Sequence, residues 1–325
     1  KKQYFMKVLI IGCGAIGKRH IENLVELNHS PDNICVWNRG AERLNQVKKL
    51  YKVKTFTSLE GVFKTERPNI SFICSPTSKH LENAYLAAKY NCDIFIEKPI
   101  SHNSKNLDNF RTYCKKKKLI VQVASNLRFH LGPSKILKII NNLEVGDIIW
   151  AEFYCGMSLP TWHPKEDYKK MYSSKKKLGG GVLLDIIHEI DLACWFFGTC
   201  KNVIGRSYNS GTLDIETDEF ADLILLYKDK NVCIHLDYIQ NPYSRGIKVI
   251  GKKGILTWSL EDNFIKLYKN KKKEKKIIFP KNYKKNDMYV EQLKYFIKCV
   301  KKRQQPHNNI QSGIDSLKIV EKLKK

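Results

Sequence analysis

Short apolar runs alternate with longer amphipathic stretches over the first part of the chain. The apolar runs are 6–11, 34–37, 70–74, 93–97 and 119–123. The stretches between them with helical spacing of apolar positions are 15–28, 41–51, 79–90 and 103–117. Short apolar runs separated by amphipathic helices are typical of parallel strands covered on both faces. The pattern predicts a doubly wound α/β domain, a Rossmann dinucleotide-binding fold, over residues 1–124.

The pattern changes in the second part of the chain, where long runs of alternating polarity dominate. We expect a helix near 133–142, a strand over 146–156 and a helix opened by glycines over 179–198. Further alternating runs predict two hairpins, 219–242 turning at 228–231 and 245–260 turning at 251–254, and a strand region at 264–280. Helices at 287–302 and 311–324 close the chain. The prediction is an α+β substrate-binding and oligomerisation domain over 125–325, with a mostly antiparallel open sheet.

Two features of this second domain remain open. Its C-terminal helices, 287–325, are able to pack back between the two domains. An open sheet with helices on one side leaves its other face uncovered, and a second copy of the chain would cover it. We therefore expect a homodimer or homotetramer.

Composition narrows the class of protein. The chain has 325 residues, enough for two cores, and 42% hydrophobic residues. Its apolar runs fall well short of the roughly 20 residues that span a bilayer, and the N-terminal stretch lacks a signal-peptide cleavage site. The ten cysteines form no CxxC pair and most lie inside apolar runs. These features predict a cytoplasmic protein with reduced thiols, no metal site and no membrane partner.

The formal net charge of +26 comes almost entirely from lysine. The lysine runs fall at helix ends and turns, and no aromatic residues are interleaved with them as in a nucleic-acid-binding motif. We expect a solvated basic surface and no nucleic-acid partner, compatible with attraction for phosphate-bearing substrates.

The first chemical motif is GxGxxG, formed by Gly12, Gly14 and Gly17 with Ala15 and Ile16 between them. It follows an apolar strand and opens a helix, which is the context of a dinucleotide-binding turn. Gly12 permits the tight turn, Gly14 lets the backbone approach a pyrophosphate, and Gly17 lets helix and strand pack closely. The helix N-terminus then offers N–H groups to the phosphates.

The second strand ends in Asn38-Arg39, where NAD-binding domains usually place an acidic residue on the ribose. A carboxylate would repel a 2′-phosphate, whereas an arginine pairs with it. The cofactor is thus NADP or NAD, and this position favours NADP. Alternatively, Arg39 stacks on adenine or is a solvated turn residue.

Two later strands end where the same crevice is expected, because ligands bind outside the carboxyl ends of such strands. After the strand at 70–74, the candidate cofactor-lining residues are Cys74, Ser75, Pro76, Thr77 and His80. For His80 a structural role is equally in keeping with its place in the first turns of a helix. After the strand at 93–97 come Glu97 and Lys98, followed by Pro99. Lys98 is expected where nicotinamide meets substrate.

The order GCGAIG, SPTSKH, EKP, SNLRFHLGP and GGGVLLDIIHEID resembles the Gfo/Idh/MocA family of NAD(P)-dependent oxidoreductases over nearly the whole chain. The resemblance implies that Lys98 contacts both cofactor and the reacting sugar hydroxyl, that a cis bond precedes Pro99, and that Asp185 and His188 face the lysine. The family often spaces the last two residues by four positions; here the spacing is three, which leaves the partner of Asp185 open.

The implied activity is hydride transfer between nicotinamide and a hydroxyl carbon of a sugar, sugar derivative or nucleotide sugar, as in bacterial surface-sugar pathways. The alternatives are a non-catalytic nucleotide-binding regulator and an NAD-dependent glycosidase. Candidate substrate residues are Arg128, His130, Trp162 and His163. Arg128 is also a candidate for a salt bridge, and the loop with Trp162 and His163 for a structural plug.

Overall fold

The computed structural model describes residues 6–162, 164, 166–269 and 274–323, and the chain divides into two compact units. Unit 1 consists of residues 1–124 and 289–314, and unit 2 of residues 125–288 and 315–325. The first long segment of unit 1 ends at Ala124, and unit 2 begins at Ser125. The segment 289–314, which the sequence analysis assigned to the second domain, belongs to unit 1.

Unit 1 is built on a six-stranded parallel sheet with the order β3-β2-β1-β4-β5-β6. Its strands are β1 (Val8–Ile11), β2 (Ile34–Trp37), β3 (Lys54–Phe56), β4 (Ile70–Ile73), β5 (Asp93–Ile96) and β6 (Val121–Val123). Between them lie α1 (Ala15–Glu26), α2 (Ala41–Tyr51), α3 (Leu59–Glu66), α4 (His80–Lys89) and α5 (Leu107–Lys116). The predicted doubly wound α/β fold is confirmed, with β3 and α3 as elements that the sequence analysis missed.

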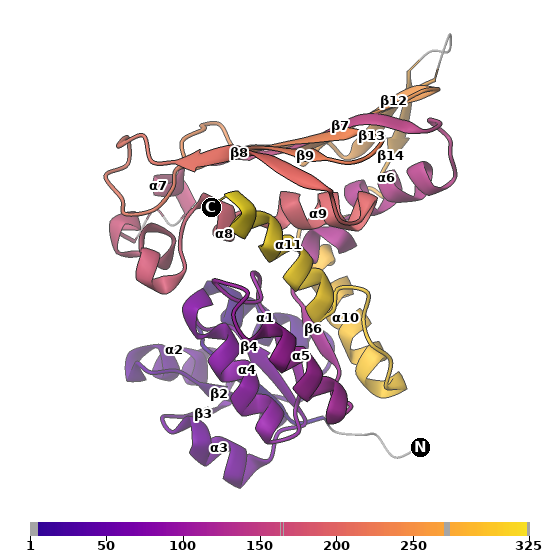
Figure 1. Ribbon diagram of the computed structural model, residues 1–325. Helices are drawn as coiled ribbons and strands as arrows, with labels where there is room; N and C mark the ends of the chain where they lie inside the picture. Colours follow the sequence, from indigo (N-terminus) through magenta and orange to yellow (C-terminus); the bar gives the residue numbers. More distant parts are fainter. Residues whose placement is uncertain (1–5, 163, 165, 270–273, 324–325) are drawn as a thin grey trace. The chain divides into compact units, whose positions relative to one another are not determined.

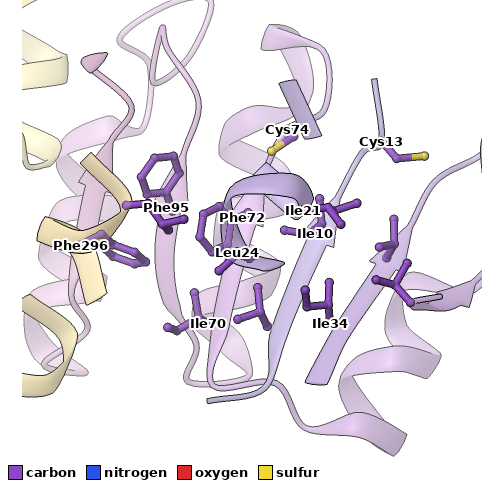
Figure 2. Packing of buried hydrophobic residues seen from close by; sticks show 14 of the residues in the cluster. Ile10, Cys13, Ile21, Leu24, Ile34, Ile70, Phe72, Cys74, Phe95 and Phe296 are labelled. Atoms are coloured by element: carbon purple, nitrogen blue, oxygen red, sulfur yellow. The ribbon is translucent and has the colours of Figure 1, made fainter. Parts of the chain in front are cut away.

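The core of unit 1 explains why a C-terminal segment belongs to it. Figure 2 shows side chains of β1, β2, β4 and β5 packed with Ile21 and Leu24 of α1. Phe296 of α10 (Asp287–Lys302) meets the ring of Phe95 at 5.4 Å between centroids, and Phe95 stacks on Phe72 at 4.8 Å. Each fully buried phenylalanine contributes roughly 1.5–3 kcal/mol of burial free energy, so this contact holds α10 on unit 1.

Unit 2 is built on an eight-stranded sheet with the order β14-β13-β12-β11-β7-β10-β9-β8. Its strands are β7 (Ile148–Gly156), β8 (Asn202–Tyr208), β9 (Phe220–Leu226), β10 (Asn231–Asp237), β11 (Ser244–Gly251), β12 (Gly254–Ser259), β13 (Phe264–Lys269) and β14 (Lys275–Ile278). Only β7 and β10 pair in parallel among these neighbours. The mostly antiparallel sheet is confirmed, and β8 is a further strand that the sequence analysis missed.

The helices of unit 2 gather on one face of this sheet, where Figure 1 shows α6 and α9. They are α6 (Leu131–Asn141), α7 (Leu159–Trp162), α8 (Val182–Asp185) and α9 (His188–Phe197), and α11 (Ile310–Leu323) closes the chain. The predicted single helix over 179–198 is wrong in one respect: Ile186 and Ile187 separate α8 from α9. Among the described residues, none of the helices is long and apolar enough to cross a bilayer.

The opposite face of the eight-stranded sheet is open. The strand registers place Ile204, Ile224, Cys233, Glu152 and Lys248 in one cross-strand row, and each is partly or fully exposed. Ile204 and Ile224 are 55% and 40% exposed, although isoleucine is usually buried.

Candidate functional site

The glycine turn joins β1 to α1 in unit 1. Gly12 has φ +103°, and a Cβ there would lie 2.6 Å from the carbonyl oxygen of Cys74. A Cβ on Gly17 would lie 2.1 Å from the Gly12 carbonyl oxygen. Both positions therefore require glycine, for the turn and for close approach of helix and strand. Gly14 is the N-cap residue of α1 and makes no side-chain cap hydrogen bond, so the first-turn N–H groups can receive an anion.

Gly14 differs from the other two glycines because its Cβ position is open. The nearest heavy atom to that position is Nη1 of Arg43, at 3.9 Å. Packing within the protein therefore does not explain a glycine here, whereas a pyrophosphate lying against the backbone does. An open Gly14 at the helix N-terminus is in keeping with a dinucleotide-binding turn.

We expect Gly14→Ala and Gly17→Ala to separate binding from stability. Gly14→Ala should leave the unfolding midpoint unchanged and weaken dinucleotide binding about tenfold, equivalent to about 1.4 kcal/mol. Gly17→Ala should lower the free energy of unfolding by about 1–3 kcal/mol because its methyl group overlaps backbone. Thermal unfolding and fluorescence titration with NADH and NADPH measure both. Unchanged dinucleotide affinity in Gly14→Ala would contradict the assignment of this turn.

The turn after β2 is tied to the glycine turn by Asn38. The amide N–H of Cys13 donates to Oδ1 of Asn38 at 3.5 Å, and Nδ2 of Asn38 donates to the Gly40 carbonyl at 3.2 Å. Arg39 is exposed. The sequence analysis missed Arg43, which lies in the first turn of α2 and whose Nη1 approaches the Gly14 Cβ position.

The turn after β4 is fixed by two side chains of α4. Ser75 Oγ accepts a hydrogen bond from Nδ2 of Asn83 at 2.9 Å. The ring nitrogens of His80 lie 2.8 Å (Nε2) from the Ser75 carbonyl oxygen and 2.7 Å (Nδ1) from the Pro99 carbonyl oxygen. Burial lowers the pKa of His80, and the two carbonyl oxygens act in the opposite direction. His80 thus lies between the turns after β4 and β5, and its neutral imidazole donates to one of the two carbonyl oxygens.

The remaining candidates of the glycine and β4 turns differ in exposure. Ala15 is exposed and Ile16, Ser75 and Pro76 are half-buried, whereas Thr77 is buried. Cys74 is buried as well, and burial raises the pKa of its thiol. A neutral thiol at this position contributes packing and no charge.

Lys98 lies just beyond β5, and the peptide bond to Pro99 is cis, as expected from the sequence. Lys98 itself is half-buried. The preceding Glu97 is 8% exposed, and its Oε1 lies 2.7 Å from Nε2 of His20 on α1. The sequence analysis missed His20, whose partner is 77 positions away; a polar residue on the buried side of an amphipathic helix was the available signal.

In unit 2, Asp185 ends α8 and His188 begins α9. The Asp185 carboxylate accepts hydrogen bonds from the hydroxyl groups of Tyr172, Ser173 (2.6 Å) and Tyr238 (3.1 Å). The sequence analysis left the partner of Asp185 open, and these three hydroxyls are partners within unit 2. His188 is 9% exposed.

Two ion pairs, one buried and one partly buried, hold the start of α9 beside His188. Glu189 Oε1 lies 2.8 Å from Nε of Arg245. Asp191 accepts two hydrogen bonds from Arg128, at 2.8 Å to Nε and 2.6 Å to Nη2. Arg128, a candidate for the substrate side, thus forms a bidentate ion pair within unit 2, and its guanidinium lies 5.6 Å from the ring centroid of Trp195. The two pairs fix the first turn of α9 and with it the backbone of His188.

We expect Arg128→Met to lower the free energy of unfolding by about 3–5 kcal/mol, because it leaves the carboxylate of Asp191 buried without its bidentate partner. Lys252→Met is the matched control in unit 2, since Lys252 forms an exposed pair with Asp147, and we expect a change below about 1 kcal/mol there. Denaturant unfolding of both variants provides the comparison. Equal midpoints for the two variants would contradict a structural ion pair at Arg128.

The other substrate candidates have different surroundings. His130 is buried; its Nδ1 accepts from the Gly132 N–H at 3.0 Å, which caps α6, and burial lowers its pKa to about 4. Trp162 is half-buried and meets Tyr238 edge-on at 5.6 Å, and among the described residues its Nε1 has no hydrogen-bond partner. His163 lies outside the described residues.

The described residues contain no cluster of His, Cys, Asp and Glu suited to a metal ion. A pocket of about 370 Å³ opens between α2, β3 and α3, lined by residues such as Leu44, Phe56 and Val62. None of the predicted site residues lines it.

Known protein families match both halves of the chain. The family model "Oxidoreductase family, NAD-binding Rossmann fold" matches residues 6–125, and the model "GFO/IDH/MocA C-terminal domain" matches residues 134–257. With the open glycine turn, these matches define an NAD(P)-dependent oxidoreductase with a Rossmann domain. The chain belongs to the Gfo/Idh/MocA oxidoreductase family.

Similar proteins span nearly the whole chain. Myo-inositol 2-dehydrogenase of Thermotoga maritima is 25% identical over 319 residues, covering 93% of this chain and 90% of that protein. The scyllo-inositol 2-dehydrogenase (NAD(+)) of Bacillus subtilis is 24% identical over 315 residues, covering 94% and 89%. A solved levoglucosan dehydrogenase, in complex with NADH and levoglucosan, superposes with a TM-score of 0.87 at 15% identity, covering 98% and 96% of the two chains. At this level of identity, the superposition on levoglucosan dehydrogenase shows a shared fold.

Proposed function

We propose that the protein transfers hydride between a nicotinamide and a hydroxyl-bearing carbon of a sugar, sugar derivative or nucleotide sugar. The observation that carries the proposal is an open Gly14 above an uncapped helix N-terminus, in the same unit as Lys98 at the carboxyl end of β5. Full-length similarity to two inositol dehydrogenases supports polyhydroxylated substrates.

In the proposed reaction, His188 takes the proton of the substrate hydroxyl as the carbon gives up its hydride. A nicotinamide held at the glycine turn would supply the hydride acceptor. The Lys98 ammonium stabilises the alkoxide character that develops on the oxygen, and it does so best at a site from which water is excluded. The two ion pairs beside His188 hold its backbone so that the imidazole needs little reorganisation.

Asp185 acts in this proposal as the organiser of the polar wall of the substrate site. Its carboxylate holds the hydroxyls of Tyr172 and Tyr238, and Tyr238 supports the edge of Trp162. The half-buried ring of Trp162 is a surface for the apolar face of a sugar.

The proposed cofactor preference is for NADP over NAD. Support comes from Asn38 in the place of a ribose-binding carboxylate, and from the cations Arg39 and Arg43 near the same turn. The ratio of kcat/KM for the two cofactors tests it. Arg39→Asp combined with Arg43→Ala should shift that ratio toward NAD; an unchanged ratio would contradict the preference.

The activity itself is tested by incubating the protein with NAD or NADP and a panel of substrates, and following the absorbance of reduced nicotinamide. The panel contains myo-inositol, scyllo-inositol, levoglucosan, free hexoses and uridine-diphosphate sugars. The proposal expects cofactor reduction with at least one of them. Dinucleotide binding without turnover across the panel, and in the reverse direction with the corresponding ketones, would favour the non-catalytic regulator.

For the assembly we propose a homo-oligomer formed through the open face of the eight-stranded sheet. We expect Ile224→Lys to weaken it, because Ile224 and Ile204 form an exposed apolar pair on this face, and a buried lysine in an interface is costly. Sedimentation at micromolar concentration should give a dimer or tetramer for the wild type and a shift toward monomer for Ile224→Lys. A monomeric wild type would contradict the proposal.

A further inference from the structure

Lys98 lies between two residues that are each held by a buried histidine. On one side, Oε1 of Glu97 lies 2.7 Å from Nε2 of His20. On the other side, the Pro99 carbonyl oxygen lies 2.7 Å from Nδ1 of His80. His20 is 1% exposed and His80 is 2% exposed, and they come from different helices, α1 and α4. The backbone is therefore anchored immediately before and immediately after the lysine.

His20 lies in apolar surroundings, and its polar contact is with Glu97. Its ring packs against the apolar rings of Phe72 and Phe95, with centroids 5.3 and 5.0 Å away. Among the described residues, its Nδ1 has no hydrogen-bond partner. A phenylalanine or leucine would fill this space without burying an unpaired nitrogen, which is costly. The contact with Glu97 is what a histidine adds at this position.

His80 extends the same support to the dinucleotide turn. Its Nε2 lies 2.8 Å from the Ser75 carbonyl oxygen. Ser75 follows Cys74, whose carbonyl oxygen would be 2.6 Å from a Cβ on Gly12. A continuous series of close contacts thus runs from the glycine turn through the turn after β4 to Pro99.

We propose that His20 and His80 are positioning residues for Lys98, which fix its backbone from both sides and couple it to the pyrophosphate-binding turn. The proposal rests on the proposed function for the role of Lys98, while the anchoring itself concerns unit 1 alone. A lysine side chain on a fixed backbone needs less ordering when substrate binds, and a displacement of about 1 Å in such a group is sufficient to lower a rate about 100-fold.

The test uses two variants of His20. His20→Phe keeps an aromatic ring but has no N–H to donate to Glu97, and His20→Gln supplies an amide N–H in its place. Leu24→Ala is the matched control, because Leu24 lies on the same helix, in the buried cluster with Phe72 and Phe95, and its aliphatic side chain cannot hydrogen-bond to Glu97. His80→Phe tests the second anchor. Each variant is assayed for kcat, for KM of the cofactor, and for backbone hydrogen exchange in the peptide 96–101 relative to the β4 peptide.

We expect His20→Phe to lower kcat about 100-fold with little change in cofactor KM, and to speed exchange in 96–101 selectively. His20→Gln should recover most of the rate, and Leu24→Ala should destabilise the protein without a selective change in 96–101. His80→Phe should lower kcat and also raise cofactor KM, because it releases Ser75 as well.

Several outcomes overturn the proposal. If backbone hydrogen exchange in residues 96–101 is unchanged in both His20→Phe and His80→Phe, the two histidines do not anchor this segment. That conclusion holds whatever reaction the protein catalyses. Faster exchange with unchanged kcat excludes the positioning role. If the wild type turns over no substrate, the proposed function fails by that observation, and the exchange measurement still decides whether the two histidines anchor the segment.

Discussion

Lys98→Met is expected to lower kcat by about 10²–10³-fold, the usual effect of removing one preorganised donor from a developing oxyanion. Methionine keeps most of the length and the apolar stem of lysine, so the cofactor dissociation constant and the unfolding midpoint should stay close to the wild-type values. The measurement is steady-state turnover with the best substrate of the panel, together with fluorescence titration of reduced cofactor.

Lys79→Met is the matched control for this variant. Lys79 belongs to the turn after β4, and its ammonium forms an exposed pair with Glu82. Lys79→Met removes one positive charge from this region and keeps Lys98. It should therefore leave kcat unchanged. An equal loss of kcat in both variants would point to general attraction of an anionic cofactor, and would contradict a role for Lys98 at the reacting oxygen.

His188→Asn is the second variant with a large expected effect, a loss of kcat of about 10²–10⁴-fold for removal of a general base. In the oxidative direction, wild-type kcat should fall as pH is lowered and the imidazole takes up a proton. The variant should lack this fall in kcat at low pH, because asparagine does not titrate. Profiles of kcat against pH for both proteins measure this directly.

Asp185→Asn helps to interpret that result. The amide of asparagine still offers an acceptor to Tyr172, Ser173 or Tyr238 but has lost the charge and one acceptor oxygen. We therefore expect Asp185→Asn to lower kcat less than His188→Asn does, and to keep the fall in kcat at low pH. If His188→Asn keeps the fall in kcat at low pH, or turns over at the wild-type rate, His188 is not the group that takes the proton.

The parts of the fold that were predictable from the sequence are those in which local pattern and burial agree. Strands β1, β4 and β5 are fully buried and apolar except for Ser71 and Asp93, and the glycine turn follows β1 directly. β3 was missed because it is a three-residue edge strand that begins with an exposed lysine, and β8 because most of its residues are exposed. Edge strands have only one neighbour, and their apolar alternation is weak for that reason.

The parts of the site that were not predictable depend on contacts between distant positions. Glu97 and His20 are 77 positions apart, and Arg128 and Asp191 are 63 apart. Neither pair follows a helical or strand repeat, so each residue was open to several roles. For Arg128 the sequence left both a substrate contact and a salt bridge open, and only the folded chain shows the partner.

The most direct test of the account is a crystal structure of the protein with bound cofactor and a substrate from the panel. The account predicts the pyrophosphate on the first-turn N–H groups of α1, above Gly14, with Lys98 and His188 both within hydrogen-bonding distance of the same substrate oxygen. A dinucleotide bound elsewhere, or a substrate oxygen touched by neither side chain, would contradict it.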